Sequence, residues 1–422
     1  MKLAGIIILL IMFFLHRFCF AYLITGDAYY HLLVASEWRK MGKRPGFLNW
    51  ISPKEEYLYP PFYHWLLKSG VRSTYICFAA ELLVVFLFLA QNHNRVNLIN
   101  ILFSLIILVF SPIVLNQTYA ATPRPLGYLF AVLTVISLVN SFNNWYWIII
   151  TSLLFTLMVL THKLASQTMI FVIVIICIYY KWYYLFILIP LIWLLGYIIL
   201  GKHFLSIIRD HVNFVKVHIK YGDLYSGQKE LFPIFKMIKS QPYLLLLPFL
   251  PYHNVWFVWL ISTLILSLFW PWGDGYRYIY YATWPLAWLI LSVDLSNPVA
   301  LGLLIAAFLI NIGFIFYDIK HKKLKIKNDT SWKQALLLLT SGWPNDYLVM
   351  TLPRNEYLVA WTLGGGRAFG VAPNAMGIKR EFEMFKPNQN SMASLKKLVQ
   401  NFNYKLLIIA TKTNYRISLK KQ

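Results

Sequence analysis

Residues 97–115 read NLINILFSLIILVFSPIVL, a stretch without a single charged side chain. The hydrocarbon core of a bilayer is about 30 Å thick, and a helix needs about 20 mostly apolar residues to cross it. The stretch therefore predicts a transmembrane helix. Similar runs continue on both sides of it, and we expect about eleven spans in all. They lie at about 3–24, 72–90, 97–115, 125–139, 145–160, 164–180, 182–200, 238–252, 254–270, 276–292 and 298–317.

The composition also indicates a helical membrane protein. Of the 422 residues, 59% are hydrophobic and 13% are charged, whereas a soluble domain has about 45–50% apolar and about 25% charged residues. A soluble enzyme, a disordered chain and a nucleic-acid-binding domain are therefore excluded. Cys19, Cys77 and Cys177 all lie inside apolar runs, so we expect small buried hydrophobic side chains and no disulfide.

The positive charge is distributed between the apolar runs. The chain has 39 Lys and Arg against 16 Asp and Glu, which gives a net charge of +23. Eleven spans would place the longer polar segments on one side of the membrane, which we call the working face. These segments are 27–72, 116–124, 161–163, 201–239 and 271–277. Cations there can meet lipid head groups or anionic substrates, although the positive-inside rule alone puts this face in the cytoplasm.

Two regions follow from the pattern. Residues 1–317 form the predicted transmembrane domain, with a first outer loop at 25–71 and a second long loop at 201–240. Gly222 and Gly227 are candidate hinges of a lid in the second loop, and the alternative is that this loop is an interfacial amphipathic segment. Residues 318–422 form a basic linker and a small soluble domain. Strands are predicted at Tyr347 to Leu352, Arg367 to Ala372 and Lys405 to Ala410, and a helix at Ser394 to Phe402. The fold class is therefore an α-helical polytopic membrane protein with a small C-terminal α/β domain.

The first candidate site is the sequence GDAYYH at 26–31, directly after the first span. Asp27 and His31 are four residues apart, so they share a face of a helix. A carboxylate at the membrane rim can act as a general base or bind a cation. The alternative is that Asp27 simply begins a helix and that the tyrosines are interface aromatics.

The same loop continues as YPPFYHW at 59–65. Two prolines and four aromatic side chains suit a stiff stretch at the membrane interface. Tyr59 and His64 are candidate substrate contacts in this stretch. A re-entry turn with a lipid-facing aromatic belt is the alternative.

Cations are expected at three further points of the working face. Arg124 stands between two prolines at the start of a span and can hold a phosphate, or it snorkels at a helix end. His162 and Lys163 share a tight turn. Arg277 opens a late span between Tyr276 and Tyr278, and it either binds an anion or pairs with Asp274.

Two charged residues lie inside predicted spans. Arg17 falls in the first span and Glu81 in the second. A charged side chain at that depth is costly unless it is paired. We therefore expect each to have a partner within the helical bundle.

Taken in order, these motifs resemble the polytopic glycosyltransferases of the GT-C fold, which use a polyprenyl-phosphate-linked sugar as donor. The matching residues are Asp27 after the first span, YPP at 59–61 before the second, Thr161 and His162 at a middle span, and YRY at 276–278 opening a late span. The chain is distantly similar to oligosaccharyltransferase catalytic subunits and to protein mannosyltransferase-like enzymes. The loop at 116–124 holds no carboxylate, unlike the second acidic motif of oligosaccharyltransferases.

The resemblance implies an inverting membrane glycosyltransferase of the cell envelope. Its donor would be a sugar on dolichyl- or undecaprenyl-type phosphate, and its acceptor a lipid, a glycan or a protein. Asp27 would be the catalytic base, and Arg277, Arg124, Lys163 and His162 would bind the donor phosphate. A divalent cation, Mg²⁺ or Mn²⁺, is left open, with Asp27 and His31 as its ligands. The working face and the C-terminal domain would lie outside the cell, against the positive-inside count.

Two other classes of function fit the sequence. A transporter or flippase of a lipid-linked or anionic solute would also be a basic polytopic protein. Transporters often show inverted repeats and broken helices near the midplane, whereas here no repeat is visible and the charges gather at one face. A noncatalytic assembly subunit is the third interpretation.

Overall fold

The computed structural model describes residues 2–24, 27–48, 51–52, 55–92, 97–226, 233–269 and 275–340, and four strands within 347–419. The chain divides into two compact units. Unit 1 comprises Met1–Leu23, Arg72–Phe204 and Glu230–Lys322, and unit 2 comprises Ile24–Val71, Leu205–Lys229 and Lys323–Gln422. The two units are described separately below.

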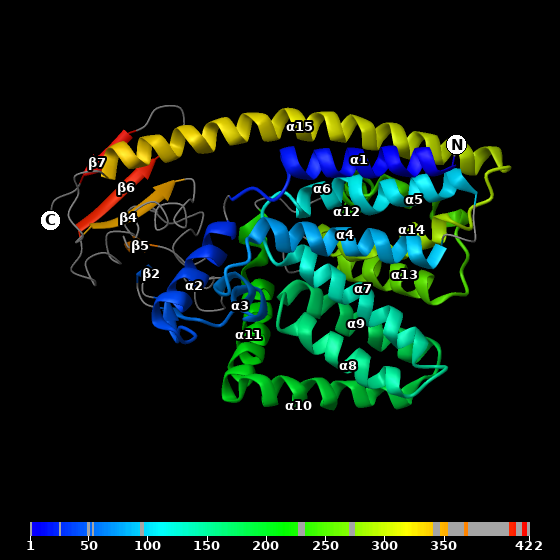
Figure 1. The fold of residues 1–422 in the computed structure, drawn as a ribbon, viewed down its shortest axis with the longest axis horizontal. Helices are drawn as coiled ribbons and strands as arrows, with labels where there is room; N and C mark the ends of the chain where they lie inside the picture. Colours follow the sequence, from blue (N-terminus) through cyan, green and yellow to red (C-terminus); the bar gives the residue numbers. More distant parts are fainter. Residues whose placement is uncertain are drawn as a thin grey trace. The chain divides into compact units, whose positions relative to one another are not determined.

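Unit 1 is a bundle of apolar helices, most of which run beside one another (Figure 1). Among the described residues, four segments are long and apolar enough to cross a membrane: Ser73–Asn92, Leu98–Gln117, Tyr183–Leu200 and Pro298–Lys320. Five shorter apolar helices accompany them. The bounds are α1 Lys2–Phe20, α4 Ser73–Asn92, α5 Leu98–Phe110, α6 Pro112–Gln117, α7 Arg124–Asn140, α8 Tyr146–Val159, α9 Lys163–Tyr179, η1 Tyr183–Ile187, α10 Leu188–Leu200, α12 Pro233–Ser240, η2 Pro242–Phe249, α13 Val255–Phe269, η3 Gly275–Ala282, α14 Thr283–Ile290 and α15 Pro298–Thr340.

These helices coincide closely with the predicted apolar runs, so the structure confirms a helical protein of membrane type. The count of eleven spans stays a prediction. Prolines explain why two of the predicted spans, 97–115 and 238–252, are not continuous α-helices. Pro112 begins α6 and separates it from α5, because proline has no N–H to donate to the preceding turn. Pro242 and Pro248 lie in η2, a 3-10 helix within the predicted span at 238–252, which the sequence already marked as interrupted by Pro242 and Pro251.

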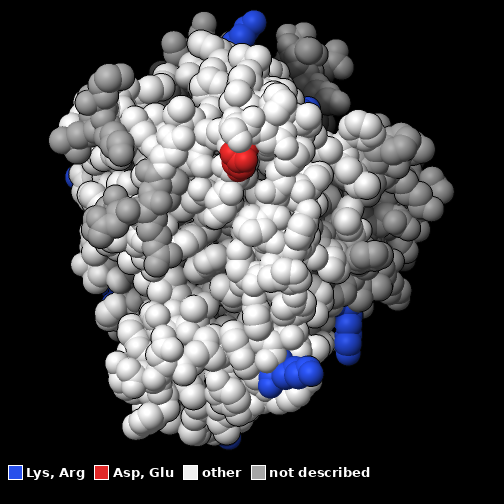
Figure 2. Space-filling model, turned by 90° about the vertical axis from the view of Figure 1, so that its right-hand side faces the viewer, with Lys and Arg blue, Asp and Glu red and all other residues white. Residues whose placement is uncertain are grey.

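The core of unit 1 lies between α4, α5, α7, α9, α13 and α14. α7 packs on α8 and α4, α9 packs on α13, and α5 packs on α14. Many buried polar side chains in this core bond within their own helix; Thr134 Oγ1, for example, donates to Phe130 O at 2.7 Å. Figure 2 shows one end of the molecule, where the described surface is almost entirely uncharged, with Lys and Arg near its margins.

Three predictions need correction. The second long loop at 201–240 is mostly helical: α11 runs over Lys202–Ser226 and α12 over Pro233–Ser240. Gly222 lies inside α11, so it is no loop hinge, whereas Gly227 lies outside the described residues. The basic segment after residue 318 is no break in structure either, because α15 continues through it. Finally, Cys19 is exposed, while Cys77 and Cys177 are buried; all three are free.

Unit 2 combines the first outer loop with the C-terminal region. Its helices are α2 Asp27–Met41 and α3 Phe62–Lys68, which pack on each other. β1 Phe47–Leu48 pairs antiparallel with β3 Glu55–Glu56. A second sheet has the order β2-β5-β4-β6-β7, in which β2 (Ile51–Ser52) lies parallel to β5 (Arg367–Phe369) and β6 (Lys405–Ala410) lies between β4 (Tyr347–Leu352) and β7 (Arg416–Leu419).

The strands at Tyr347–Leu352 and Lys405–Ala410 lie where the sequence predicts them. β5 covers Arg367–Phe369 of the strand predicted at 367–372, and residues 370–372 lie outside the described residues. β7 was not predicted. The predicted helix at Ser394 to Phe402 lies outside the described residues. The small α/β domain as a whole therefore stays a prediction.

Candidate functional site

Asp27 is the first residue of α2, and its side chain is exposed. A carboxylate in the first turn is stabilised by the positive end of the helix dipole. His31 follows one turn later on the same face, but it is only 3% exposed. Asp27 is thus the start of a helix, as the alternative interpretation expected, but Tyr29 and Tyr30 are buried and are no interface aromatics. The role of Asp27 as a base stays a prediction.

Behind Asp27, a chain of hydrogen-bonding rings joins α2 to α3. His31 Nδ1 lies 2.8 Å from His64 Nε2, and His64 Nδ1 lies 2.7 Å from Tyr57 Oη. In a neutral histidine one ring nitrogen donates and the other accepts. When Tyr57 donates to Nδ1 of His64, Nε2 of His64 therefore carries the proton and donates to His31. The hydrogen-bond directions in this Tyr57–His64–His31 chain are coupled.

The chain is enclosed by aromatic rings. The centroid of His31 lies 5.1 Å from that of Tyr59 and 5.4 Å from that of Tyr63, and His64 and Tyr57 are fully buried. Burial, assisted by the His31 ring, holds the pKa of His64 well below its usual 6.5. Burial raises the pKa of Tyr57 well above 10.0. Both side chains are therefore neutral at pH 7. His64 is buried and bonds to His31 of α2 instead of facing solvent.

In unit 1, the first turns of α7 and α9 meet. A Cβ atom built on Gly127, one turn after Arg124, would lie 2.8 Å from His162 Cβ, so only glycine allows this approach. His162 precedes α9 and accepts a hydrogen bond from Ala165 N. The close contact brings Arg124 and Lys163 to the same end of the bundle, each at a helix N-terminus.

η3 lies against this end and adds Arg277. His162 Nδ1 lies 3.1 Å from Tyr281 Oη, and Tyr278 donates to Gln167 Oε1 at 2.9 Å, so η3 is bonded to both faces of the first turns of α9. Arg277 is partly exposed, as are Arg124 and Lys163. The structure thus groups the three segments that carry the predicted phosphate-binding residues. Asp274, the predicted partner of Arg277, lies outside the described residues.

A further cation in this group was missed by the sequence interpretation. Lys236 of α12 lies over the ring of Tyr276, with Nζ 4.2 Å from the centroid. A cation–π contact of this kind is favourable and fixes the ammonium group beside η3. In the sequence, only the basic character of 201–239 indicated that a cation of this loop could join the site. Lys236 and Tyr276 are far apart in the sequence, so their contact could not be predicted from local patterns. Tyr276 therefore contacts a cation, and Tyr278 is buried.

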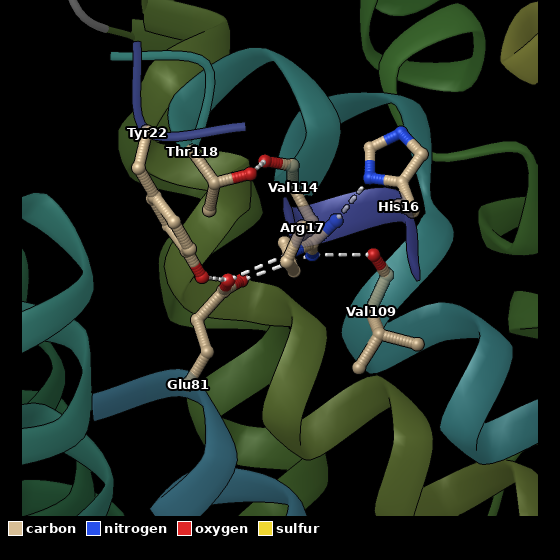
Figure 3. A network of polar contacts seen from close by, with 7 residues as sticks. All are labelled: His16, Arg17, Tyr22, Glu81, Val109, Val114 and Thr118. Atoms are coloured by element: carbon tan, nitrogen blue, oxygen red, sulfur yellow. Dashed lines mark hydrogen bonds and ion pairs between the residues drawn. The ribbon is translucent and has the colours of Figure 1, made fainter. Parts of the chain in front are cut away.

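Arg17 and Glu81 are paired with each other, as expected of charges inside the bundle (Figure 3). Arg17 Nε donates to Glu81 Oε2 at 2.8 Å and Nη2 to Glu81 Oε1 at 3.1 Å. Nη2 also donates to Val109 O at 2.6 Å, and Nη1 lies 3.0 Å from His16 Nδ1. The Tyr22 hydroxyl donates to Glu81 as well. One ionic network thus ties α1, α4 and α5 together.

The network also holds the chain in an unusual conformation after α1. Tyr22 has a φ of 56°, in the left-handed region that side chains other than glycine rarely adopt. Its N–H donates to Thr118 O at 3.0 Å, and Leu23 N–H donates to Tyr119 O at 2.9 Å. The segment that leaves α1 is therefore fixed to 118–121 through its main chain and to Glu81 of α4 through the Tyr22 side chain. Such strain often marks functional regions.

The predicted site residues fall into two groups. Asp27, His31, Tyr59 and His64 lie in unit 2, and His31, Tyr59 and His64 are in direct contact. Arg124, His162, Lys163, Arg277, Tyr276 and Tyr278 lie in unit 1 around the meeting point of α7, α9 and η3. The sequence-based expectation that Asp27 and Arg277 face one cavity stays a prediction.

A divalent cation does not fit the candidate ligands. Within the described ranges, no group of three or more His, Cys, Asp or Glu side chains could hold a metal ion. Asp27 and His31 together supply a single carboxylate, whereas Mg²⁺ and Mn²⁺ favour several oxygen ligands. We therefore derive no step through a metal. No protein-family model and no curated protein sequence matches the chain.

Proposed function

We propose that this protein is a membrane glycosyltransferase that transfers a sugar from a polyprenyl-phosphate-linked donor to an acceptor hydroxyl with inversion. One observation carries the proposal: α7, α9 and η3, which are far apart in the sequence, meet at one end of the bundle and bring Arg124, Lys163 and Arg277 with them. A polytopic helical protein with a cationic group of this kind is suited to an anionic lipid.

The chemistry of this group favours a phosphate. The N-termini of α7 and α9 each carry the positive end of a helix dipole. Helix N-termini bind phosphate readily for this reason. Arginine adds a planar donor set that matches phosphate oxygens, and lysine adds a mobile point charge. Lys236, fixed over Tyr276, increases the positive potential at the same place.

In the proposed reaction, the Asp27 carboxylate takes the proton of the acceptor hydroxyl while its oxygen attacks the anomeric carbon. The bond from the anomeric carbon to the phosphate oxygen breaks, and the lipid phosphate leaves with the bonding electrons. Arg277, Arg124, Lys163 and His162 stabilise the negative charge that gathers on this leaving group. The Tyr57–His64–His31 chain holds the first turns of α2, and with them Asp27, against α3.

The assay uses purified protein, a radiolabelled polyprenyl-phosphate sugar and an acceptor mixture extracted from the host membrane. Asp27→Asn is expected to abolish transfer while donor binding stays unchanged, since it removes only the base. Arg277→Gln is expected to reduce the rate by about 10²–10³, the typical loss for one such donor. The matched controls are Asp294→Asn and Arg72→Gln, exposed residues outside the site. Full transfer by Asp27→Asn would exclude the proposal.

The finer topology belongs to the same proposal: about eleven spans, with the working face outside the cell. Single cysteines at Ser69 and Asn143, both exposed, test the sidedness in a variant without the three native cysteines. A membrane-impermeant maleimide should label the Ser69→Cys variant in intact cells and the Asn143→Cys variant only after permeabilisation. The reverse pattern would place the working face in the cytoplasm, as the charge count suggests.

A transporter or flippase remains the second candidate, favoured by the Arg17–Glu81 pair. Ionisable groups inside a helical bundle often mark transport pathways. Sealed vesicles containing the protein separate the two functions. Movement of a polyprenyl-phosphate sugar across the vesicle membrane without transfer to any acceptor would support transport and contradict the enzyme.

A further inference from the structure

Several buried side chains of unit 1 carry polar atoms that meet no hydrogen-bond partner within the described part of the chain, and three of them belong to segments that pack on one another. The atoms of these three are Gln117 Oε1, both side-chain polar atoms of Gln241, and Tyr280 Oη. The three residues are 3%, 0% and 1% exposed. Native proteins leave few buried polar groups unsatisfied, because each loses its bonds to water without replacement. A group of them at one place therefore indicates an absent partner.

These residues come from three segments that pack on one another. Gln117 is the last residue of α6, and Tyr280 lies in η3. Gln241 follows α12 directly, and its N–H donates to Met237 O at 2.8 Å, which continues the last turn of that helix. α6, α12 and η3 are all in mutual contact. We call this place the α6–α12–η3 junction.

The junction adjoins the cations of the proposed phosphate site. In a 3-10 helix, side chains three residues apart lie above one another, so Arg277 and Tyr280 share an edge of η3. Lys236 belongs to α12 and contacts Tyr276 at the start of η3. The ring of Tyr280 stacks near that of Tyr128, with centroids 4.6 Å apart, which fixes its orientation. A ligand whose charge meets Arg277 would therefore have its neutral part close to the junction.

The junction also has the means to open. Both η2, which begins after Gln241, and η3, which contains Tyr280, are eight-residue 3-10 helices. Runs of this length are uncommon, because the hydrogen-bond geometry is poor, and they often mark hinges. The unpartnered atoms are closed off from solvent in the structure. A change of either segment toward regular α-helix would move Gln241 or Tyr280 and expose them.

We propose that the α6–α12–η3 junction is the subsite for the sugar of the lipid-linked donor. Gln117, Gln241 and Tyr280 offer amide and hydroxyl groups that both donate and accept, as the hydroxyls of a sugar ring require. They carry no charge, so they suit the neutral ring and not the phosphate. This inference rests on the proposed function, since it concerns the donor of that reaction.

The test compares two probes, a polyprenyl phosphate and the same lipid with one sugar attached. Gln241→Leu and Tyr280→Phe keep the shape of each side chain but remove its polar atoms. Each should weaken binding of the sugar-bearing lipid about threefold to tenfold, the value of one hydrogen bond, and leave binding of the sugar-free lipid unchanged. Ser111→Ala is the control, because it removes another buried hydroxyl without a described partner, at the opposite end of α6.

Each outcome is decisive. Equal affinity of the wild-type protein for both probes, or unchanged affinity of both variants for the sugar-bearing lipid, would overturn the subsite while leaving the phosphate site intact. Loss of binding of both probes in the variants would also overturn it, since the junction would then act on the phosphate. If the wild-type protein binds neither lipid, the proposed function itself fails. Thermal unfolding of each variant distinguishes these results from misfolding.

Discussion

Replacing Glu81 by leucine isolates the free energy held in the ionic network of Figure 3. The substitution removes both oxygens that Arg17 contacts and the acceptor of the Tyr22 hydroxyl. Arg17 is 1% exposed and keeps only its bonds to Val109 O and His16 Nδ1, neither of which supplies a negative charge. Removal of one partner from a buried ion pair costs about 3–5 kcal/mol. We expect that loss for Glu81→Leu.

The double variant Arg17→Met with Glu81→Leu should behave differently. It leaves no buried charge, and replacing a buried ion pair by apolar side chains is often neutral or stabilising by about 1–4 kcal/mol. The expected result is therefore strong coupling: the double variant is more stable than either single variant. If the two substitutions were independent, the double variant would instead lose the sum of the two single losses.

The measurement is denaturant unfolding of the purified protein in detergent micelles, followed by tryptophan fluorescence, for all four members of the cycle. Asp294→Asn serves as the control, because Asp294 is exposed and bonds only to Ser296 nearby; no shift of its midpoint is expected. A loss below about 1 kcal/mol for Glu81→Leu, well short of the expected range, would refute a fully desolvated pair. Additive losses in the double variant would refute the coupling.

Two further predictions concern other parts of the molecule. Because the pKa of His64 is lowered by burial, the unfolded chain binds a proton near pH 6.5 that the folded chain does not. Stability should therefore fall as the pH drops from 7 through 6.5 toward the folded pKa, by at most about 1.4 kcal/mol per pH unit, and His64→Phe should remove this slope; a slope that persists in the variant contradicts the assignment. Gly127→Ala should destabilise the protein by about 1–3 kcal/mol, because the new Cβ meets His162. Both substitutions are compared by thermal unfolding. Gly302→Ala, with open space around it, should be neutral or slightly stabilising. Equal effects of the two substitutions would show that the α7–α9 contact is not tight.

Much of the helical framework followed from local patterns. Apolar runs predicted the bounds of α4, α7, α8 and α9 to within two residues or so, because hydropathy is a property of consecutive residues. The need of Arg17 and Glu81 for a partner also followed, because burial of an isolated charge is unfavourable in any fold. The exception was 201–240, where polar and apolar residues alternate. That segment was predicted as a lid loop, with an amphipathic segment as the alternative, and its mixed sequence forms the amphipathic helix α11.

The candidate site shows where such prediction ends. The motif at 26–31 indicated a carboxylate with a histidine one turn away, but the partner of that histidine is His64, which lies in another helix. The Lys236–Tyr276 contact was indicated only by the basic character of 201–239, and the unpartnered group Gln117, Gln241 and Tyr280 left no local signal. Each depends on helices that meet through packing between distant segments.

By itself, the sequence determined that this is a basic protein of membrane-type helices, because chain length, apolar runs and charge are fixed residue by residue. Only the tertiary structure decided that Arg17 pairs with Glu81, 64 positions away, and that the first turns of α7 and α9 meet through Gly127. These outcomes require side chains to fill space without overlap, and that condition applies to the packed bundle as a whole and not to any segment of it.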